Sequence, residues 1–440
     1  MSVVGDSASA RAEWKAGWTV VLASMIGMSF NPLLLYTSGL FIAPLQAEFG
    51  WGRGQITSGL TVYALIAVVF SPFVGAMIDR VGPRRIAILG IFVFCSAFAC
   101  LATATRSPLH WWVLWLFVAL GALLLKPTVW TAAVASRFNA GRGLAIAVML
   151  CGTGIASTLG PTVGELLLEN YGWRMTYVGL ALIWCAMALP LLLIFFHGAD
   201  DLSRRNRATE ATTIKRATAL GLTVGEALRT ARFWKLAVSV TLVVFTLTAI
   251  LVHFVPLLTA SGMKPAAAAT TAGLIGISSI IGRLTTGFLL DRISGPLIGG
   301  VALILPVFAD AGLLMFDGSP HMSVVIALLI GLSSGAELDI AAYLVARYFG
   351  LPNFGTLFGI IVGFIIFATG TGPLAGGLIY DRFGSYDVGL WAAMPICLVA
   401  SLLVATLGRY PIFPVEEQMP VTAPKQVSIR VRAFQGVKRR

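Results

Sequence analysis

Residues 75–82 read Gly75-Ala-Met-Ile-Asp79-Arg80-Val-Gly82, and residues 287–294 read Gly287-Phe-Leu-Leu-Asp291-Arg292-Ile-Ser294. The two stretches are 212 residues apart and share a glycine followed four residues later by Asp-Arg. Each lies at the end of an apolar segment of about 20 residues, which is long enough to cross a bilayer. The same offset carries Gly160-Pro161 onto Gly372-Pro373. The sequence therefore predicts two related halves.

A second offset divides each half again. Asp79 and Glu169 are 90 residues apart, and so are Asp291 and Asp381. Each acid closes an apolar segment, so the pattern predicts four repeated units of three helices. Such units, alternating in direction, are typical of secondary transporters that expose a site near the middle of the membrane to each side in turn.

The composition excludes a soluble fold. Of the 440 residues, 58% are hydrophobic and only 11% are charged, whereas soluble domains carry about 25% charged residues. We predict an all-α integral membrane protein with twelve transmembrane helices in two six-helix, pseudo-symmetric bundles. The predicted spans are 17–44, 56–78, 86–104, 110–135, 143–167, 175–197, 233–260, 266–290, 297–316, 321–346, 357–380 and 387–408.

The basic residues predict the orientation. With both termini in the cytoplasm, 24 of the 31 Lys and Arg residues lie in the termini and loops on that side, in agreement with the positive-inside rule. The net charge of +12 then reflects topology and requires no nucleic-acid partner. We expect a multi-pass protein of the plasma (inner) membrane. Its expected parts are a cytoplasmic N-terminus (1–16), a first bundle (17–197), a cytoplasmic linker (198–232), a second bundle (233–408) and a cytoplasmic tail (409–440).

No motif indicates catalysis. The sequence contains no zinc-ligand spacing, nucleophile elbow, phosphate-binding loop or dinucleotide fingerprint, and its four histidines are scattered. The five cysteines lie in apolar stretches and indicate no disulfide framework. We therefore expect neither an enzyme nor an ATP-driven pump. We expect no cofactor, and we expect the protein to act as a monomer.

The first motif carries a resemblance to a known family. Residues 75–85 match the G-x-x-x-D-R-x-G-x-R/K-R/K signature of the major facilitator superfamily, and the chain resembles that family over its whole hydrophobic body. Within the superfamily it is most similar to monocarboxylate transporter-like and oxalate/formate antiporter-like members. The pieces that carry this likeness are Gly17-Trp18, Arg137-Phe138, Arg142-Gly143-Leu144-Ala145, and Arg283 followed by Gly287 and Asp291. The resemblance implies a secondary transporter of a small organic anion.

The sequence departs from that likeness in one respect. Such members usually have a second basic residue in span 1 or span 11 to accompany the span 8 arginine. Here the span 1 position falls near Tyr36, and span 11 contains no Lys, Arg or His. The coupling mechanism of monocarboxylate transporters therefore cannot simply be copied.

Arg283 is the principal candidate for binding substrate. A charge inside a bilayer costs several kcal/mol and needs a partner or a water-filled cavity. The planar guanidinium suits two-point binding of a carboxylate. Arg283 could instead be permanently paired with Glu337 or Asp339. The resemblance favours contact with the substrate.

Three other charged residues lie near the middle of the predicted spans. Glu337 and Asp339 in span 10 are roughly 200° apart around the helix, so only one can face a given cavity. Either could carry a proton, because removal from water favours the neutral carboxyl form, or could simply hold helices together. Lys126 in span 4 corresponds to Leu338 under the 212-residue offset. We expect Lys126 to bind substrate and, in alternation with substrate or proton binding, to pair with a span 10 acid across the two halves. Alternatively, Lys126 could extend toward the membrane surface.

The remaining candidates are polar residues in apolar segments and charged residues at span ends. His253 could bind an anion or relay protons, or could be satisfied by a hydroxyl. Asn31, Tyr36 and Tyr343 are further candidates for binding substrate. Asp310, in peripheral span 9, is read as structural or unexplained. The expected gate residues, at the cytoplasmic ends of spans 2 and 8, are Asp79, Arg80, Arg84, Asp291 and Arg292.

Two functions remain open from the sequence. We favour a proton-coupled symporter of a carboxylate, whose partners are a small organic anion, protons and the lipid bilayer. The alternative is efflux or antiport of hydrophobic or cationic compounds. In that case acids alone would bind the cargo and Arg283 would be dispensable.

Overall fold

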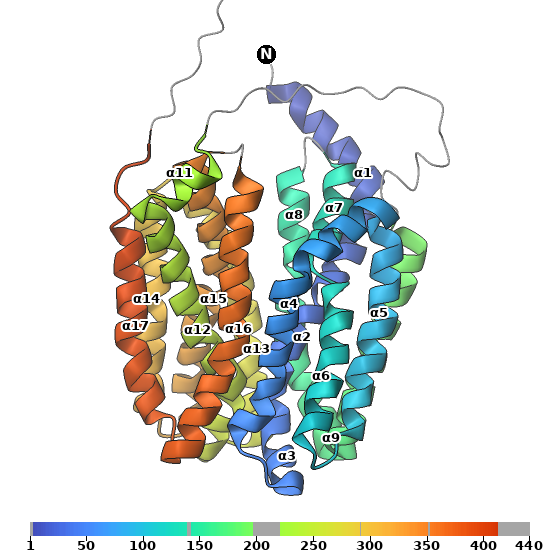
Figure 1. Ribbon diagram of the computed structural model, residues 1–440, viewed down its shortest axis with the longest axis vertical. Helices are drawn as coiled ribbons and strands as arrows, with labels where there is room; N and C mark the ends of the chain where they lie inside the picture. Colours follow the sequence, from blue (N-terminus) through green and yellow to red (C-terminus); the bar gives the residue numbers. More distant parts are fainter. Residues whose placement is uncertain (1–2, 139–141, 197–220, 291, 351–352, 412–440) are drawn as a thin grey trace, which may run out of the picture.

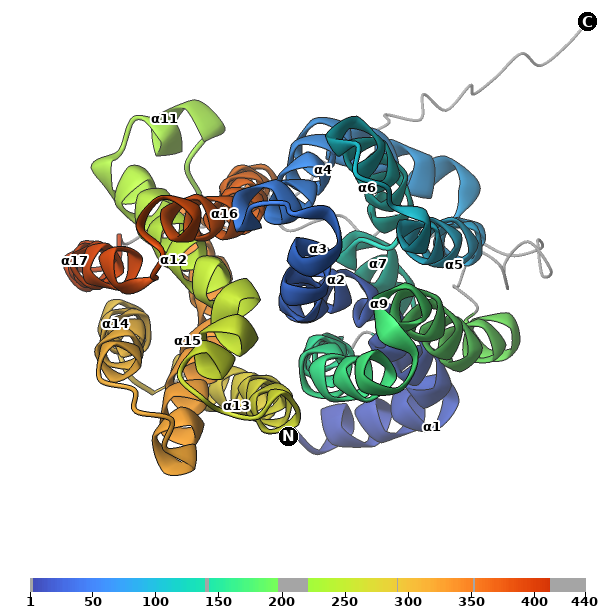
Figure 2. The ribbon, with the colours of Figure 1, turned by 90° about the horizontal axis from the view of Figure 1, so that it is seen from below.

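The computed structural model describes residues 3–138, 142–196, 221–290, 292–350 and 353–411. Within these ranges the chain is almost wholly helical, and the one extended pairing is a bridge between Gly221 and Gly350. The helices form two bundles that lie side by side (Figures 1 and 2). The all-α membrane fold predicted from the composition is confirmed.

In the part of the chain that the structure describes, the first bundle has nine α-helical segments. They are α1 (Val3–Met28), α2 (Phe30–Ser38), α3 (Ile42–Phe49), α4 (Arg53–Val81), α5 (Pro83–Cys100), α6 (Pro108–Leu123), α7 (Pro127–Arg137), α8 (Arg142–Leu150) and α9 (Gly152–Phe195). Short 3-10 turns at Gly39–Phe41 and Leu101–Thr103 extend α2 and α5.

The second bundle follows a short helix, α11 (Val224–Leu228), that marks one face of the molecule, here named the α11 face (Figure 1). Its long helices are α12 (Ala231–Ala260), α13 (Pro265–Leu290), α14 (Gly295–Leu314), α15 (Pro320–Phe349), α16 (Phe354–Phe383) and α17 (Asp387–Ala405). The start of α1 lies at the same face (Figure 1).

Eleven helical stretches of the described residues are long and apolar enough to cross a membrane. One of them, Leu144–Phe195, has 52 residues, more than twice the length that one crossing requires. Gly172 interrupts it with non-helical angles (φ 74°, ψ 168°), a conformation that glycine adopts without strain. This stretch therefore supplies two spans, and the predicted number of twelve is confirmed.

Several spans differ in detail from the prediction. The helix of span 1 begins at Val3, well before residue 17, and is interrupted at Ser29 between α1 and α2. Span 4 is divided into α6 and α7. Pro127 lacks an amide hydrogen and Lys126 before it is extended (φ −62°, ψ 155°), so the helical ladder stops there.

Glycines let α13 and α15 pack backbone against backbone. A Cβ atom on Gly335 would lie 2.0 Å from the carbonyl oxygen of Ser279, and one on Gly331 would lie 2.4 Å from that of Ile275. The Ser278 hydroxyl also donates to the Leu328 carbonyl at 2.7 Å. This close approach fixes which residues of α15 face α13.

Helices α4 and α16 bring the two bundles together toward the face opposite α11. There, a Cβ on Gly370 of α16 would lie 2.1 Å from the Cβ of Ala64 in α4, and the Thr61 hydroxyl donates to the Gly370 carbonyl at 2.7 Å. Nearer the α11 face, by contrast, a Cβ on Gly359 or Gly363 of α16 would have no atom of the described residues within 4 Å. The two helices therefore touch toward one face and diverge toward the other (Figure 1).

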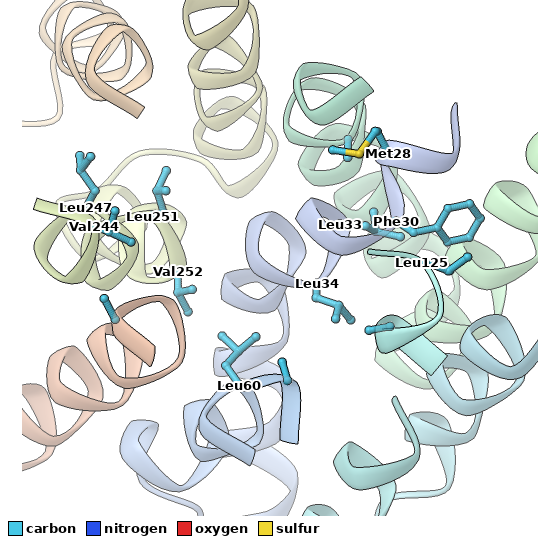
Figure 3. Packing of buried hydrophobic residues seen from close by; sticks show 14 of the residues in the cluster. Met28, Phe30, Leu33, Leu34, Leu60, Leu125, Val244, Leu247, Leu251 and Val252 are labelled. Carbon is cyan, nitrogen blue, oxygen red and sulfur yellow. The ribbon is translucent and has the colours of Figure 1, made fainter. Parts of the chain in front are cut away.

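Apolar residues from both bundles seal this contact. Leu34 of α2, Leu60 of α4 and Val252 of α12 are at most 2% exposed and lie around the meeting point of the bundles (Figure 3). A Cβ on Gly39 would lie 2.2 Å from the Val252 carbonyl oxygen, so here too the backbones nearly touch.

We predict that Gly335→Ala destabilises the protein by about 1–3 kcal/mol, because the new methyl group must displace the α13 backbone. Gly359→Ala is the control, since its methyl group would enter open space and alanine favours the helix. Unfolding in detergent micelles measures both. Equal stability of the two variants would contradict the packing described here.

Candidate functional site

A charged pair links α13 and α15. The Arg283 guanidinium lies 3.0 Å from the Asp339 carboxylate, and their side chains are 11% and 25% exposed. A second ion pair, between Arg174 and Glu48, is far more exposed, at 46% and 38%. Arg283 therefore has the partner that a charge inside a membrane requires, and both side chains keep a small exposed fraction.

Residues of the first bundle lie close to this pair. Tyr36 of α2 contacts the side chain of Ser334 and lies within electrostatic range of Arg283 and Glu337. Cys151, at the junction of α8 and α9, lies within range of Arg283 and Asp339. We name these residues the central cluster: Tyr36, Cys151, Arg283, Ser334, Glu337 and Asp339.

Glu337 differs from Asp339 in its surroundings. Its Oε2 atom is buried and has no hydrogen-bond partner among the described residues, although Arg283 and Asp339 are near. The rotation between the two positions explains why only Asp339 makes the ion pair. The two acids predicted from the sequence therefore differ: Asp339 forms the ion pair with Arg283, and Glu337 does not.

In this arrangement of the helices, Lys126 does not form the predicted ion pair with span 10. The Lys126 ammonium, 9% exposed, donates to the Ala67 carbonyl of α4 at 3.1 Å, within its own bundle. The break in span 4 directs Lys126 toward α4. Asp339 is paired with Arg283 instead.

Asn31 lies at the same break. Its side chain donates to the Leu125 carbonyl at 2.9 Å and accepts from the Tyr63 hydroxyl at 3.1 Å. The Trp130 indole donates to the same carbonyl at 3.0 Å. These bonds satisfy a backbone oxygen that the interrupted helix leaves free.

His253 and Tyr343 lie apart from the central cluster. The His253 ring bonds to the Pro373 carbonyl at 2.9 Å and to the Tyr386 hydroxyl at 2.8 Å. This is the hydroxyl-bonded alternative left open by the sequence. Tyr343 packs against the start of α14, where its ring would lie 3.0 Å from a Cβ on Gly295.

The predicted gate residues are described only in part. The side chains of Asp79 and Arg80, and the whole of Asp291, lie outside the described residues. Arg84 donates to the Leu193 carbonyl at 2.7 Å, and the Arg292 guanidinium lies 3.5 Å from the centre of the Phe288 ring. The assignment of these five residues to a gate stays a prediction.

Asp310 has no role that the structure explains. It is fully buried in α14, and neither carboxylate oxygen has a hydrogen-bond partner among the described residues.

Comparisons with known proteins identify the family. Residues 19–338 match the sequence profile of the Major Facilitator Superfamily. The chain belongs to the Major Facilitator Superfamily. Like other members of this superfamily it is a membrane transporter and not an enzyme, as the sequence predicted.

Individual superfamily members are similar over most of the chain. Monocarboxylate transporter 13 of Rattus norvegicus is 26% identical over 408 residues, which cover 90% of this chain and 89% of that protein. A gallate transporter of Pseudomonas putida is 25% identical over 407 residues, covering 81% and 86%. A crystal structure of a bacterial homologue of the human lysosomal transporter Spinster, inward-facing and unoccupied, has a TM-score of 0.66 at 16% identity and covers 88% and 95%.

We predict energetic coupling between Arg283 and Asp339. In a double-mutant cycle of Arg283→Met and Asp339→Leu, each single change strands a charge in a largely buried position, whereas the double change removes both. Unfolding free energies in detergent should give a coupling of about 2 kcal/mol. The exposed pair Arg174 and Glu48, treated alike, is the control and should give about 0.5 kcal/mol. Additive effects at Arg283 and Asp339 would show that the pair contributes nothing.

Proposed function

We propose that this transporter carries a small organic anion, a carboxylate, by alternating access coupled to protons. The observation that carries the proposal is the central cluster, in which a partly exposed arginine faces the junction of the two bundles. The similarity to a monocarboxylate transporter and a gallate transporter supports the same class of cargo.

The distribution of basic residues supports a cytoplasmic location for the α11 face and for both termini. In that orientation the contact between α4 and α16 closes the outer side, and the diverging ends open toward the cytoplasm. Alternating access would require this outer contact to separate while the cytoplasmic ends come together.

The ion pair suggests how the cargo is bound and coupled. Asp339 engages Arg283 through one nitrogen, Nη1, and a guanidinium has five N–H donors, so a substrate carboxylate can bind the same side chain or displace Asp339. An acid that loses its cationic partner in an apolar setting favours its protonated form. Binding of the anion would then lead to uptake of a proton by Asp339 or Glu337, and the loaded cluster would be close to neutral.

We predict that Arg283→Lys raises KM for carboxylate uptake at least tenfold, because lysine keeps the charge but loses the fork. Arg283→Ala should abolish uptake into proteoliposomes. Arg174→Lys, at the exposed ion pair with Glu48, is the matched control and should transport normally. If the Arg283→Ala variant still accumulates carboxylates and also carries hydrophobic cations, the result supports the alternative function, drug efflux or antiport.

We predict that Glu337→Gln or Asp339→Asn separates exchange from net uptake. An amide cannot take up a proton, so the variant should exchange internal for external carboxylate yet fail to accumulate it under an inward proton gradient. Glu165→Gln, which alters a buried acid of α9 outside the central cluster, should keep both activities. If the Glu337→Gln and Asp339→Asn variants both still accumulate carboxylate under the proton gradient, neither acid is required for coupling.

A further inference from the structure

We propose that the contact between the two bundles at the face opposite α11 is a proton-sensitive gate that closes only when His253 is neutral. This inference does not depend on which cargo the protein carries. It rests on a continuous set of contacts from α4 in the first bundle to α12, α16 and α17 in the second.

In one part of the gate, a residue of the second bundle caps the first turn of α4 in the first bundle. The Asp381 carboxylate, at the end of α16, accepts the backbone N–H groups of Arg53 at 2.7 Å and Gly54 at 2.8 Å. These are the first residues of α4, whose N–H groups have no partner within the helix. A Cβ on Gly52 would lie 2.5 Å from Asp381 Oδ2, so the approach depends on glycine. This cap exists only while the bundles are in contact.

The Arg53 side chain extends the contact to His253. Its guanidinium lies 3.4 Å from the centre of the Tyr380 ring and donates to the Tyr386 hydroxyl. The Tyr386 hydroxyl in turn lies 2.8 Å from His253 Nδ1, and His253 Nε2 lies 2.9 Å from the Pro373 carbonyl oxygen. Arg53 belongs to the first bundle, and the other four residues belong to the second.

The chemistry of the two ends fixes the direction of the outer hydrogen bonds. A guanidinium can only donate, and a carbonyl can only accept. His253 Nε2 therefore carries a hydrogen toward Pro373, and the Tyr386 oxygen accepts from Arg53. The Tyr386 hydroxyl then has its own hydrogen to donate to Nδ1, and in that arrangement the closed gate holds a neutral imidazole in a single tautomer.

A second proton on His253 conflicts with this arrangement. An N–H at Nδ1 would point at the Tyr386 oxygen, which already accepts from Arg53, and the tyrosine hydrogen would lose its acceptor. The charged groups that face the ring are Arg53 from α4, which would repel it, and Asp381 from α16. Both Asp381 oxygens are engaged by the α4 backbone, and the remaining polar side chains on this side of the ring are Tyr386 and, beyond it, Tyr380.

The other groups around the His253 ring would not stabilise a positive charge on it. His253 and Tyr386 border a cavity of about 100 Å³ between α12, α16 and α17, which is otherwise lined almost entirely by apolar side chains such as Ile250, Leu257 and Leu390. Protonation of His253 therefore opposes closure of the gate.

The sign of the pH dependence follows. When the bundles separate at this face, His253 gains access to water, where histidine titrates near pH 6.5. Below about pH 6.5, closing the gate must release a proton, so the closed-to-open ratio should fall by up to about tenfold for each pH unit. Above about pH 7.5 the ratio should be constant. Acid on the outer side would thus hold the gate open, separately from any proton bound at the central cluster.

Pulsed electron paramagnetic resonance tests this gate without any cargo. Spin labels at Ala47→Cys and Val388→Cys, two exposed positions at this face, report the distance between the bundles in lipid nanodiscs frozen at pH 5.5 to 8. The native cysteines are first replaced, and retained transport is verified. We expect a mainly short distance at pH 7.5 and an open fraction at least fivefold larger at pH 5.5. A wild-type distribution that does not change with pH would overturn the proposal.

Two variants and two controls assign the response to His253. His253→Gln can still donate to Pro373 and accept from Tyr386 but cannot be protonated, so the gate should stay closed at every pH. Tyr386→Phe removes the donor to Nδ1, so the gate should be more open at pH 7.5 and respond less to acid. His110→Gln changes a partly exposed histidine near the same face and should respond as wild type. Arg174→Lys, at the exposed ion pair with Glu48, should also respond as wild type. An unaltered pH response in His253→Gln, or an unaltered distribution in Tyr386→Phe, would contradict the role of His253.

Discussion

The cost of holding a guanidinium inside a membrane governs the centre of this structure. An arginine within a span must be compensated, and Asp339 provides the compensation at 3.0 Å. That distance depends on the glycines of α15, which bring its backbone against α13 and turn Asp339 toward Arg283. Because the pair is not completely buried, an anion from outside can compete for the same cation. In the function that we propose, binding and coupling both follow from this one electrostatic requirement.

A second constraint acts between the bundles. Gly52, Gly370 and Gly377 let α4 and α16 meet at the backbone, and Asp381 then caps α4 across the contact. Contacts between such rigid surfaces favour discrete closed and open arrangements over gradual deformation. The arginine centre and this capped contact lie in different places, so cargo and outer pH can influence the balance between arrangements through separate residues.

Much of the fold is readable from the sequence, because hydropathy, repeats and basic residues encode the spans directly. The special position of Arg283 is readable for the same reason. The break at Lys126-Pro127 carries a local signal, an extended residue before proline, but the direction in which Lys126 then points depends on packing against α4. Likewise, nothing local to His253 indicates that Pro373 and Tyr386, more than a hundred residues away, would occupy both ring nitrogens. Cys151 and Ser334 are ordinary residues in apolar segments, and only tertiary structure brings them to the central cluster.

Proton-coupled carboxylate transport can be measured as uptake by the wild-type protein in proteoliposomes. An aliphatic monocarboxylate, an aromatic monocarboxylate and a lipophilic cation, each radiolabelled, are supplied with and without an inward proton gradient. We expect the gradient to drive accumulation of at least one carboxylate above its external concentration and to leave the cation at the level of empty liposomes. Proton-driven movement of the cation, with no movement of either carboxylate, would contradict this expectation.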